Sequence, residues 1–311
     1  MKKLLIFLFF ISSCHFFTYA QRTKVIHDIE LKGEWPHSSK EFEIHAKKNT
    51  IGSYSVLIRF NSFENTSGVN NPSLLVVNNS GNILSLKPMD ENKHANCSYR
   101  YYYIRGYQSR RLDSSFVYRL PFSESKTSVM AISLYNIDNL YFNGKSGANW
   151  CSWQFKLNKN DTVYAMRKGM VVDVDDKHDP LDVNGVSFNT KYNSLTVEHV
   201  DGTLCRYHVI EKSSMMVSLG DMVFPGTPLA KAGVFDNSNN YQVRVDIHYP
   251  EVDRNISNPE VSPFRHVYYN PCFMTHQGVK KLKHGDEVIA VMTKDLLQKE
   301  MTKREIKKYK P

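Results

Sequence analysis

Short runs in which apolar and polar residues alternate follow one another along most of the chain, and this pattern constrains the fold class more than any other feature. A repeat of two residues is typical of strands with one buried face, whereas helices repeat every 3.6 residues. Clusters rich in Asn, Ser and Gly, such as 78–82, separate the runs. The sequence therefore predicts an all-β protein. Between 41 and 140 the runs are FEIHA, YSVLIRF, SLLVV, NILSLKP, SYRYYYIRG, SFVYRLPF and SVMAISLY.

The spacing of these runs also predicts how the chain is divided. About seven short strands over about a hundred residues are typical of an immunoglobulin-like β-sandwich. The segment NGKSGAN at 143–149 has the composition of a linker. Beyond it, Asp201-Gly202 and Gly220-Asp221 predict tight turns between strands of a second β-domain. We expect a sandwich over 21–142, the second domain over 143–274, and a C-terminal strand with a basic helical tail over 275–311.

The first twenty residues have the pattern of a secretory signal peptide. Two lysines precede an apolar run that ends in Thr18-Tyr19-Ala20, which predicts cleavage after Ala20 and a periplasmic or cell-surface location. A second interpretation is that Ile11 to Cys14 form a lipobox, so that the mature chain starts at a lipidated Cys14. Since no later run approaches ~20 apolar residues, we expect no transmembrane segment after signal cleavage.

The chain is basic, with a formal net charge of +9. For an exported protein, this charge favours anionic cell-wall polymers or membrane surfaces as partners, and we expect no nucleic-acid partner. The equally simple alternative is that the charge only aids solubility. The cysteines that remain after signal cleavage leave two alternatives open, a pair of disulfides or buried thiols. They are Cys97, Cys151, Cys205 and Cys272.

Four segments of the second domain together carry a resemblance to a known family. They are VYAMRKGMVVDV (163–174), NSLTVEHVDGTLCRYH (193–208), VSLGDMVFPGTPLAKAG (217–233) and YQVRVDI (241–247). In the order and spacing of glycines and apolar residues they resemble the β-core of the lysostaphin-type (LytM) peptidoglycan metalloendopeptidases, over roughly a third of the chain. The resemblance implies an antiparallel β-domain with the duplicated hybrid motif.

The same resemblance implies that the zinc ligands of the family are missing. That family holds zinc with a His and an Asp before the VYA strand and with the second His of an HxH motif, and these positions correspond to Trp150, Gln154 and Arg244. The first His of that motif corresponds to Gln242. Trp and Arg offer no lone pair to a metal, and Gln offers only a weak neutral carbonyl. Since His208 is the only retained site position, we expect neither zinc nor a catalytic residue.

Period-two alternation places Gln242, Arg244, Asp246 and His248 on one face of a strand. Arg244 is expected to fill the space of the metal and to pair with Asp246 or to hydrogen-bond to Gln154. An alternative is a rearranged zinc site built from His208, Asp246 and His248, because two imidazoles and a carboxylate form a known catalytic ligand set.

These observations support hypotheses of different classes. The first is an exported, catalytically degenerate LytM-like protein of the cell envelope that binds peptidoglycan or regulates a murein hydrolase. The alternative is an active zinc metalloendopeptidase that cleaves peptidoglycan cross-links through His208, Asp246 and His248. A third is an envelope scaffold that binds no glycan. Zinc is the only cofactor that any of these hypotheses requires.

Overall fold

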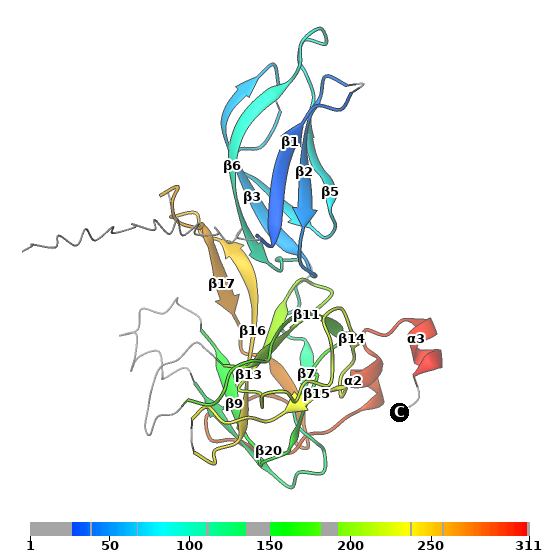
Figure 1. The fold of residues 1–311 in the computed structure, drawn as a ribbon. Coiled ribbons are helices and arrows are strands. Elements are labelled where there is room, and N and C mark those ends of the chain that lie inside the picture. The colour runs from blue at the N-terminus through cyan, green and yellow to red at the C-terminus, as the bar shows by residue number, and fades with distance from the viewer. Residues whose placement is uncertain are drawn as a thin grey trace, which may run out of the picture.

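The chain folds into two β-rich units that lie one above the other (Figure 1). The computed structural model describes residues 27–37, 39–66, 68–109, 112–134, 150–181, 192–236, 238–256 and 258–309. Apart from two short helices near the C-terminus, the regular elements of these residues are strands, which confirms the predicted all-β class. The predicted signal peptide, with Cys14, and the predicted linker at 143–149 lie outside the described residues.

The N-terminal unit is a sandwich of two three-stranded sheets, ordered β1-β2-β5 and β4-β3-β6. Apolar side chains from alternate positions of both sheets meet between them; Ile44, Val56 and Ile58 are fully buried there. The alternation seen in the sequence is therefore the cause of this core. Its strands are β1 (Ile29–Glu34), β2 (Phe42–Lys48), β3 (Tyr54–Glu64), β4 (Ser73–Val77), β5 (Gly81–Leu86) and β6 (Asn96–Arg105).

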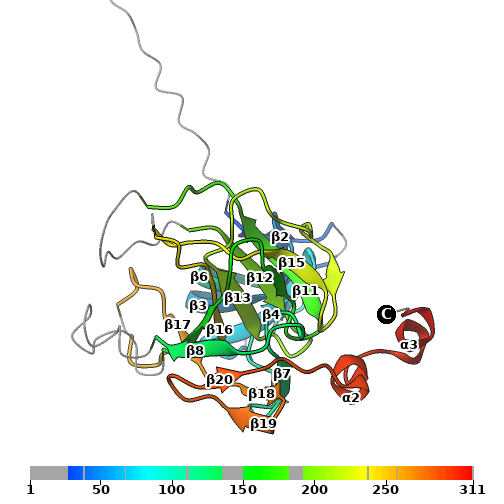
Figure 2. The same cartoon turned by 90° about the horizontal axis from the view of Figure 1, so that it is seen from below.

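The second unit is built on a nine-stranded sheet with the order β14-β11-β12-β13-β16-β9-β8-β20, to which β17 adds by pairing with β16. Two smaller sheets, β10-β15 and β19-β18-β7, belong to the same unit, and Figure 2 shows the latter at one margin. The strands are β7 (Val117–Arg119), β8 (Val129–Ser133), β9 (Ser152–Lys156), β10 (Thr162–Tyr164), β11 (Gly169–Asp175), β12 (Ser194–Glu198), β13 (Leu204–His208), β14 (Met222–Val223), β15 (Pro228–Lys231), β16 (Gln242–Val252), β17 (Phe264–Tyr268), β18 (Cys272–Thr275), β19 (Gly278–Lys281) and β20 (Glu287–Val288).

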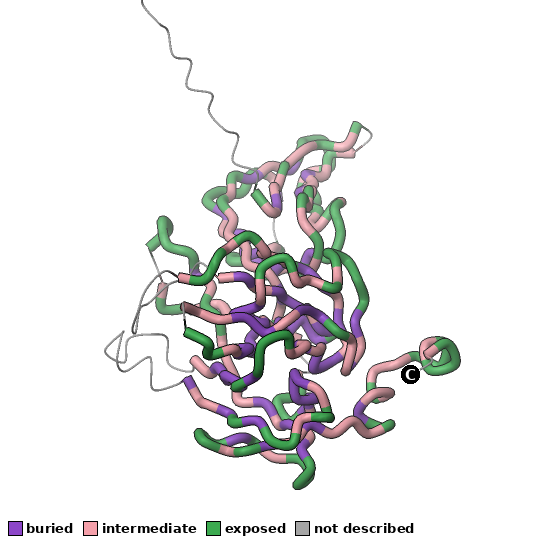
Figure 3. The backbone as a smooth tube through the Cα atoms, turned by 60° about the horizontal axis from the view of Figure 1, so that its bottom comes forward, coloured by how far each residue is buried: buried purple, intermediate pink, exposed green. Residues whose placement is uncertain are grey.

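One face of the large sheet forms the core of this unit. Along β16, Val243, Val245 and Ile247 are at most 1% exposed and pack with Tyr207 of β13 and Phe155 of β9. Figure 3 shows this buried band running through the centre of the molecule. Because side chains alternate along a strand, the residues between these apolar ones point to the opposite face. The polar side chains of β9, β13 and β16 therefore share that opposite face.

The boundary between the units differs from the predicted one at 142. All seven alternating runs contain strands, but the last two of them, β7 and β8, pair with β18 and β9 in the second unit. Their apolar side chains, including Tyr118 and Ala131, lie in its core. The strand β1 was not predicted and completes the sandwich instead. Alternation reports that a strand exists but not which sheet it joins, which explains the error.

The two units contact each other through polar groups. Glu198 of β12 accepts hydrogen bonds from the backbone N–H of Ser53, at 2.8 Å, and from the hydroxyl of the same serine. The backbone N–H of Tyr107 donates to the carbonyl of Gly202 at 3.2 Å. Gly202 has a positive φ of 79° and lies in the predicted turn at Asp201-Gly202, which is confirmed.

The hairpin of β16 and β17 makes a second contact between the units. Beyond the large sheet, β16 continues and pairs only with β17 among the described strands. The loop at the tip of this hairpin reaches β6, where the hydroxyl of Tyr102 donates to the carbonyl of Pro259 at 2.5 Å. Arg59 of β3 donates to the carbonyl of Ile256 at 3.2 Å. The hairpin that β16 forms with β17 therefore reaches from the large sheet to the N-terminal unit through its loop.

The predicted helical tail consists of two short helices, α2 (Lys294–Gln298) and α3 (Lys303–Lys308). Leu296 of α2 is buried, and Glu300 between the helices binds Arg167 through two bonds of 2.7 and 3.0 Å. Arg167 also donates to Asp201 at 2.9 Å. The tail is therefore attached to the second unit by a buried cation. None of the helices found in the described residues is long and apolar enough to cross a membrane.

The four described cysteines are free thiols; Cys97 and Cys205 are buried, whereas Cys151 and Cys272 are half-buried. Burial raises the pKa of Cys97 and of Cys151 to about 11. At neutral pH both groups are therefore protonated, and neither is an activated nucleophile.

Candidate functional site

Three of the predicted site residues form a row across the large sheet. His208 of β13 lies opposite Arg244 of β16, and Arg244 lies opposite Gln154 of β9. All three belong to the face opposite the apolar core, since their strand neighbours, such as Tyr207 and Val245, are core residues. His208 and Gln154 are nevertheless only 6% and 7% exposed. The structure thus brings together residues that lie far apart in the sequence.

Asp246 is the centre of a hydrogen-bonded cluster next to this row. Its two carboxylate oxygens each meet a histidine, with Nε2 of His208 at 2.6 Å from Oδ2 and Nδ1 of His248 at 2.7 Å from Oδ1. Nε of Arg206 lies 3.6 Å from Oδ1. Asp246 and His248 are 4% and 1% exposed. A buried carboxylate with three partners of this kind is held in one orientation.

The charge states follow from these contacts. Burial alone would raise the pKa of Asp246, but the charge of Arg206 and the two histidine bonds outweigh it and hold that pKa well below its ordinary value. Burial lowers the pKa of His208 and of His248, against the opposing attraction of Asp246. At neutral pH the cluster therefore contains an anionic Asp246 and two neutral imidazoles that donate to it.

This protonation state leaves one basic atom without a partner. Because Nε2 of His208 donates to Asp246, its Nδ1 carries a lone pair, and this buried atom has no hydrogen-bond partner among the described groups. The ring of Tyr192 meets the imidazole edge-on, with centroids 5.0 Å apart. An imidazole oriented by a carboxylate can accept a proton or a hydrogen bond from a ligand.

Arg244 does not make the contacts expected from the sequence. Its Nε donates to Oε1 of Gln242 at 2.9 Å, and its Cζ lies 4.7 Å from the ring centroid of Phe235. The predicted pairing with Asp246 or bond to Gln154 is wrong, because His208 on the neighbouring strand, together with His248 and Arg206, occupies the oxygens of Asp246. Burial lowers the pKa of Arg244. A guanidinium nevertheless remains charged at any pH relevant to a protein.

The residues of this site do not fit a zinc ion. Arg244 brings a positive charge into the middle of the row, and a guanidinium has no lone pair for a metal. In the alternative set, the nitrogens of His208 and His248 that face Asp246 are engaged in hydrogen bonds with it rather than turned to a common point. Within the described ranges, no group of three or more His, Cys, Asp or Glu side chains is arranged to hold a metal.

The other residues of the site differ in whether a sequence pattern could have predicted them. Trp150 is half-buried just before β9, outside the row formed by the other positions. Arg206 was missed, although it precedes His208 by one strand repeat and its register partner is Asp246. The alternation that placed Asp246 could have placed it. Tyr192 and Phe235 lie outside the strands, where no periodic pattern exists to predict them.

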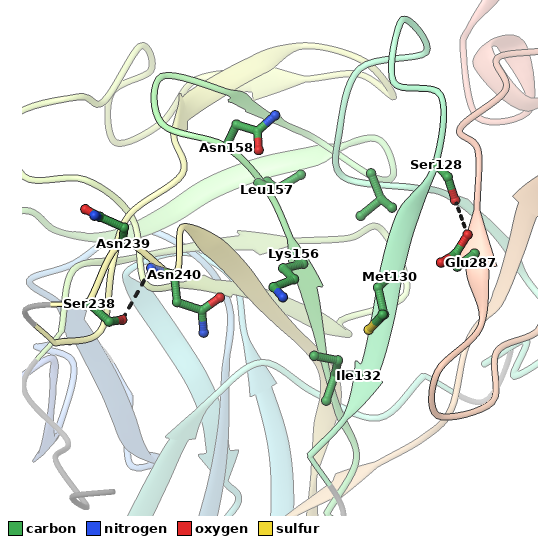
Figure 4. Close-up of a pocket in the computed structure, with 11 residues that line it drawn as sticks. Ser128, Met130, Ile132, Lys156, Leu157, Asn158, Ser238, Asn239, Asn240 and Glu287 are labelled. Carbon is green, nitrogen blue, oxygen red and sulfur yellow. Dashed lines mark hydrogen bonds between the residues drawn. The ribbon is translucent and has the colours of Figure 1, made fainter. Parts of the chain in front are cut away.

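Two hollows lie beside the row. One, of about 260 Å³, is lined by aromatic residues that contact the site, Tyr192 and Phe235, together with Asn193 and Tyr241. The other, of about 770 Å³, is shown in Figure 4. Its walls come from β8, β9 and the segment before β16, and they carry mostly amide, hydroxyl and aliphatic groups. They include Met130, Ile132, Lys156, Asn158, Asn239 and Asn240.

The second hollow lies beyond the Gln154 end of the row. Ile132 lies opposite Gln154, and Lys156 lies opposite Gln242, which is the partner of Arg244. The first hollow therefore adjoins Arg244 through Phe235, whereas the second lies one strand further away and is not lined by Arg244 itself.

No protein-family model matches the chain, and no curated protein matches it. Among solved structures, a zinc containing peptidase from Vibrio cholerae is 14% identical, with 73% of this chain and 84% of that chain covered and a TM-score of 0.26. The SpoIIQ-SpoIIIAH pore forming complex contains a chain 20% identical, with 43% and 84% covered and a TM-score of 0.30. Csd3 of Helicobacter pylori is 9% identical, with 72% and 67% covered and a TM-score of 0.28. TM-scores this low establish neither an activity nor a partner.

Proposed function

We propose that this chain is an exported, non-catalytic LytM-like protein of the cell envelope, which binds peptidoglycan or regulates a murein hydrolase through the face that carries His208, Arg244 and Gln154. The observation that carries the proposal is Arg244 in the middle of that row, held by Gln242 and Phe235. The resemblance in sequence assigns this position to a zinc ligand. A fixed cation there opposes the binding of a divalent metal, and without a metal His208 has no activated water to use.

The test is the metal content and activity of the full chain. Protein purified without chelator near neutral pH is expected to contain no stoichiometric zinc and to release no dye from labelled peptidoglycan, while it sediments with isolated sacculi or with a murein hydrolase. Dye release that a chelator abolishes would overturn the proposal. A chain that neither sediments with sacculi nor changes hydrolase activity is the envelope scaffold that binds no glycan.

The second candidate is the zinc endopeptidase that uses His208, Asp246 and His248. The observation that favours it is the unpartnered Nδ1 of His208, a lone pair that a metal would satisfy. About one zinc per chain, lost in His208→Ala, would establish this candidate. Retention of the same zinc content in His208→Ala would place any metal elsewhere.

A further inference from the structure

We propose that Arg244 binds the free carboxylate of a short peptide ligand. This inference rests on the function proposed above and names the ligand class of the same site. It follows from the charges around Arg244, from the way its guanidinium is held, and from the chemistry of the hollow beyond Gln154.

The charge of Arg244 lacks the partner that comparable arginines have. Arg167, also buried, is paired with Asp201 and Glu300 at 2.9 and 2.7 Å. Arg206 has Asp246. Among the described residues, no carboxylate lies within ion-pair distance of Arg244, and its one hydrogen bond goes to the neutral amide of Gln242. The charge of Asp236 acts on Arg244 but forms no ion pair with it. An external carboxylate would therefore supply the close anionic partner that this partly buried guanidinium lacks.

The guanidinium is also held in place for such a ligand. Gln242 fixes Nε from one side, and the ring of Phe235 lies at 4.7 Å from Cζ. These contacts do not use the two terminal nitrogens, which form the edge that receives a carboxylate in a two-bond arrangement. Because the side chain is already ordered, ligand binding loses less conformational entropy there than at a free surface arginine.

The larger hollow indicates that the rest of the ligand is a peptide. It is lined by Ile132 and Lys156, the strand partners of Gln154 and Gln242. It also carries the side chains of Asn158, Asn239 and Asn240 (Figure 4). Amide side chains both donate and accept hydrogen bonds, which matches the peptide group of a ligand. Met130 and Ile132 add apolar surface for small side chains. A peptide with its carboxylate on Arg244 would have to pass Gln154 to reach this hollow.

The experiment compares N-acetyl-Ala-Ala with its C-terminal amide, which differs in the negative charge alone. Each peptide is titrated into the full chain by calorimetry, with chelator present. We expect the acid to bind at least tenfold more tightly than the amide, because only the acid forms the charged pair. Arg244→Gln is expected to remove that preference, while Arg265→Gln, on the exposed hairpin, leaves it unchanged.

Arg244→Lys provides a second variant that keeps the charge and loses the two-bond geometry, and it should bind the acid with intermediate affinity. Equal affinity for acid and amide, an unchanged preference in Arg244→Gln, or no binding of either peptide at millimolar concentration would each overturn the inference. Neither peptide measurement depends on zinc content or dye release, so the inference can fail while the proposed function stands. If Arg244→Gln does not fold, Arg244→Lys alone tests the inference. An affinity of Arg244→Lys for the acid peptide equal to that of the wild type would then contradict it.

Discussion

His208 and Asp246 are joined by a hydrogen bond of 2.6 Å between strands β13 and β16, although they are not register partners. The opposite residue of His208 is Arg244, and the imidazole reaches diagonally past it to the carboxylate. This diagonal contact decides the arrangement of the whole site. Because Asp246 is occupied by the histidines and Arg206, Arg244 is left to the amide of Gln242.

Replacement of Asp246 by Asn tests the importance of this cluster for folding. The change removes the charge that Arg206 and both histidines contact, and we expect the free energy of unfolding to fall by about 2–4 kcal/mol. Denaturant unfolding is the measurement. Asp179→Asn is the matched control, because Asp179 is 76% exposed and its pair with Lys212 should contribute less than about 1 kcal/mol. A loss no larger than that of the control would show that the cluster is not stabilising.

The tail contact predicts a second effect. Glu300→Gln keeps the shape of the side chain but removes the charge that binds Arg167, and a loss of about 1–3 kcal/mol is expected. The tail of the variant should also be cut faster by trypsin, since its basic residues then leave the surface of the unit more often. Glu91→Gln, at an exposed position, serves as the control. Unchanged cleavage would mean that the other contacts hold the tail, namely the buried Leu296 and the ion pair of Lys168 with Glu305.

Glycines with the same backbone conformation provide a test of the junction between the units. Gly202 and Gly68 both have a φ of 79°, but an added Cβ at Gly202 would lie 2.4 Å from the carbonyl of Tyr107, whereas at Gly68 it would meet nothing within 4 Å. Gly68→Ala should therefore lower the free energy of unfolding only by the energy of placing an alanine in the left-handed conformation, about 1–2 kcal/mol. Gly202→Ala should cost about 1–3 kcal/mol more because the neighbouring unit must move. Equal losses by thermal or denaturant unfolding would contradict the contact.

The pH dependence of stability has a definite sign. Burial, reinforced by the nearby charge of Arg167, lowers the pKa of His199 to about 3, so this group stays neutral in the folded chain when its unfolded form takes up a proton. The contribution of His199 to the free energy of unfolding is fully present when the pH is above the pKa of the unfolded form, near 6.5. It decreases as the pH falls toward the pKa of the folded form, by up to about 1.4 kcal/mol per pH unit. His208 and His248 act in the same direction. His199→Gln should have a shallower decrease between pH 7 and pH 5 than the wild type; an identical slope would contradict the assignment.

The sequence predicts the elements better than their assembly. Alternation located the strands β2 to β8 and placed Gln242, Arg244, Asp246 and His248 on one face, because a strand repeat is a local property. It assigned β7 to the wrong unit, since its partner β18 lies more than a hundred residues away in the chain. Strand pairing over such separations depends on core packing, which local patterns do not contain.

The contacts within the site were likewise not predictable from local sequence patterns. His248 lies two residues beyond Asp246 along the strand, a separation that argues against contact when only backbone distances are considered. In the structure its Nδ1 turns back to within 2.7 Å of the carboxylate, with its ring packed against Tyr268 at 5.1 Å between centroids. The His248 ring packs against β17, which follows a long loop, and its orientation therefore depends on a distant part of the chain. For this reason the residue spacing predicts neither the bond between His248 and Asp246 nor the lack of a bond between Arg244 and Asp246.

The length of β16 has a mechanical consequence. Gln242 to His248 carry the site, and the same strand continues without interruption to Val252, where its hairpin partner leads to the loop held by Tyr102 and Arg59. A strand of this kind is stiff along its axis, and no hinge separates its two halves. We therefore expect a rotation of the N-terminal unit to displace Arg244, and a ligand held at Arg244 to resist that rotation.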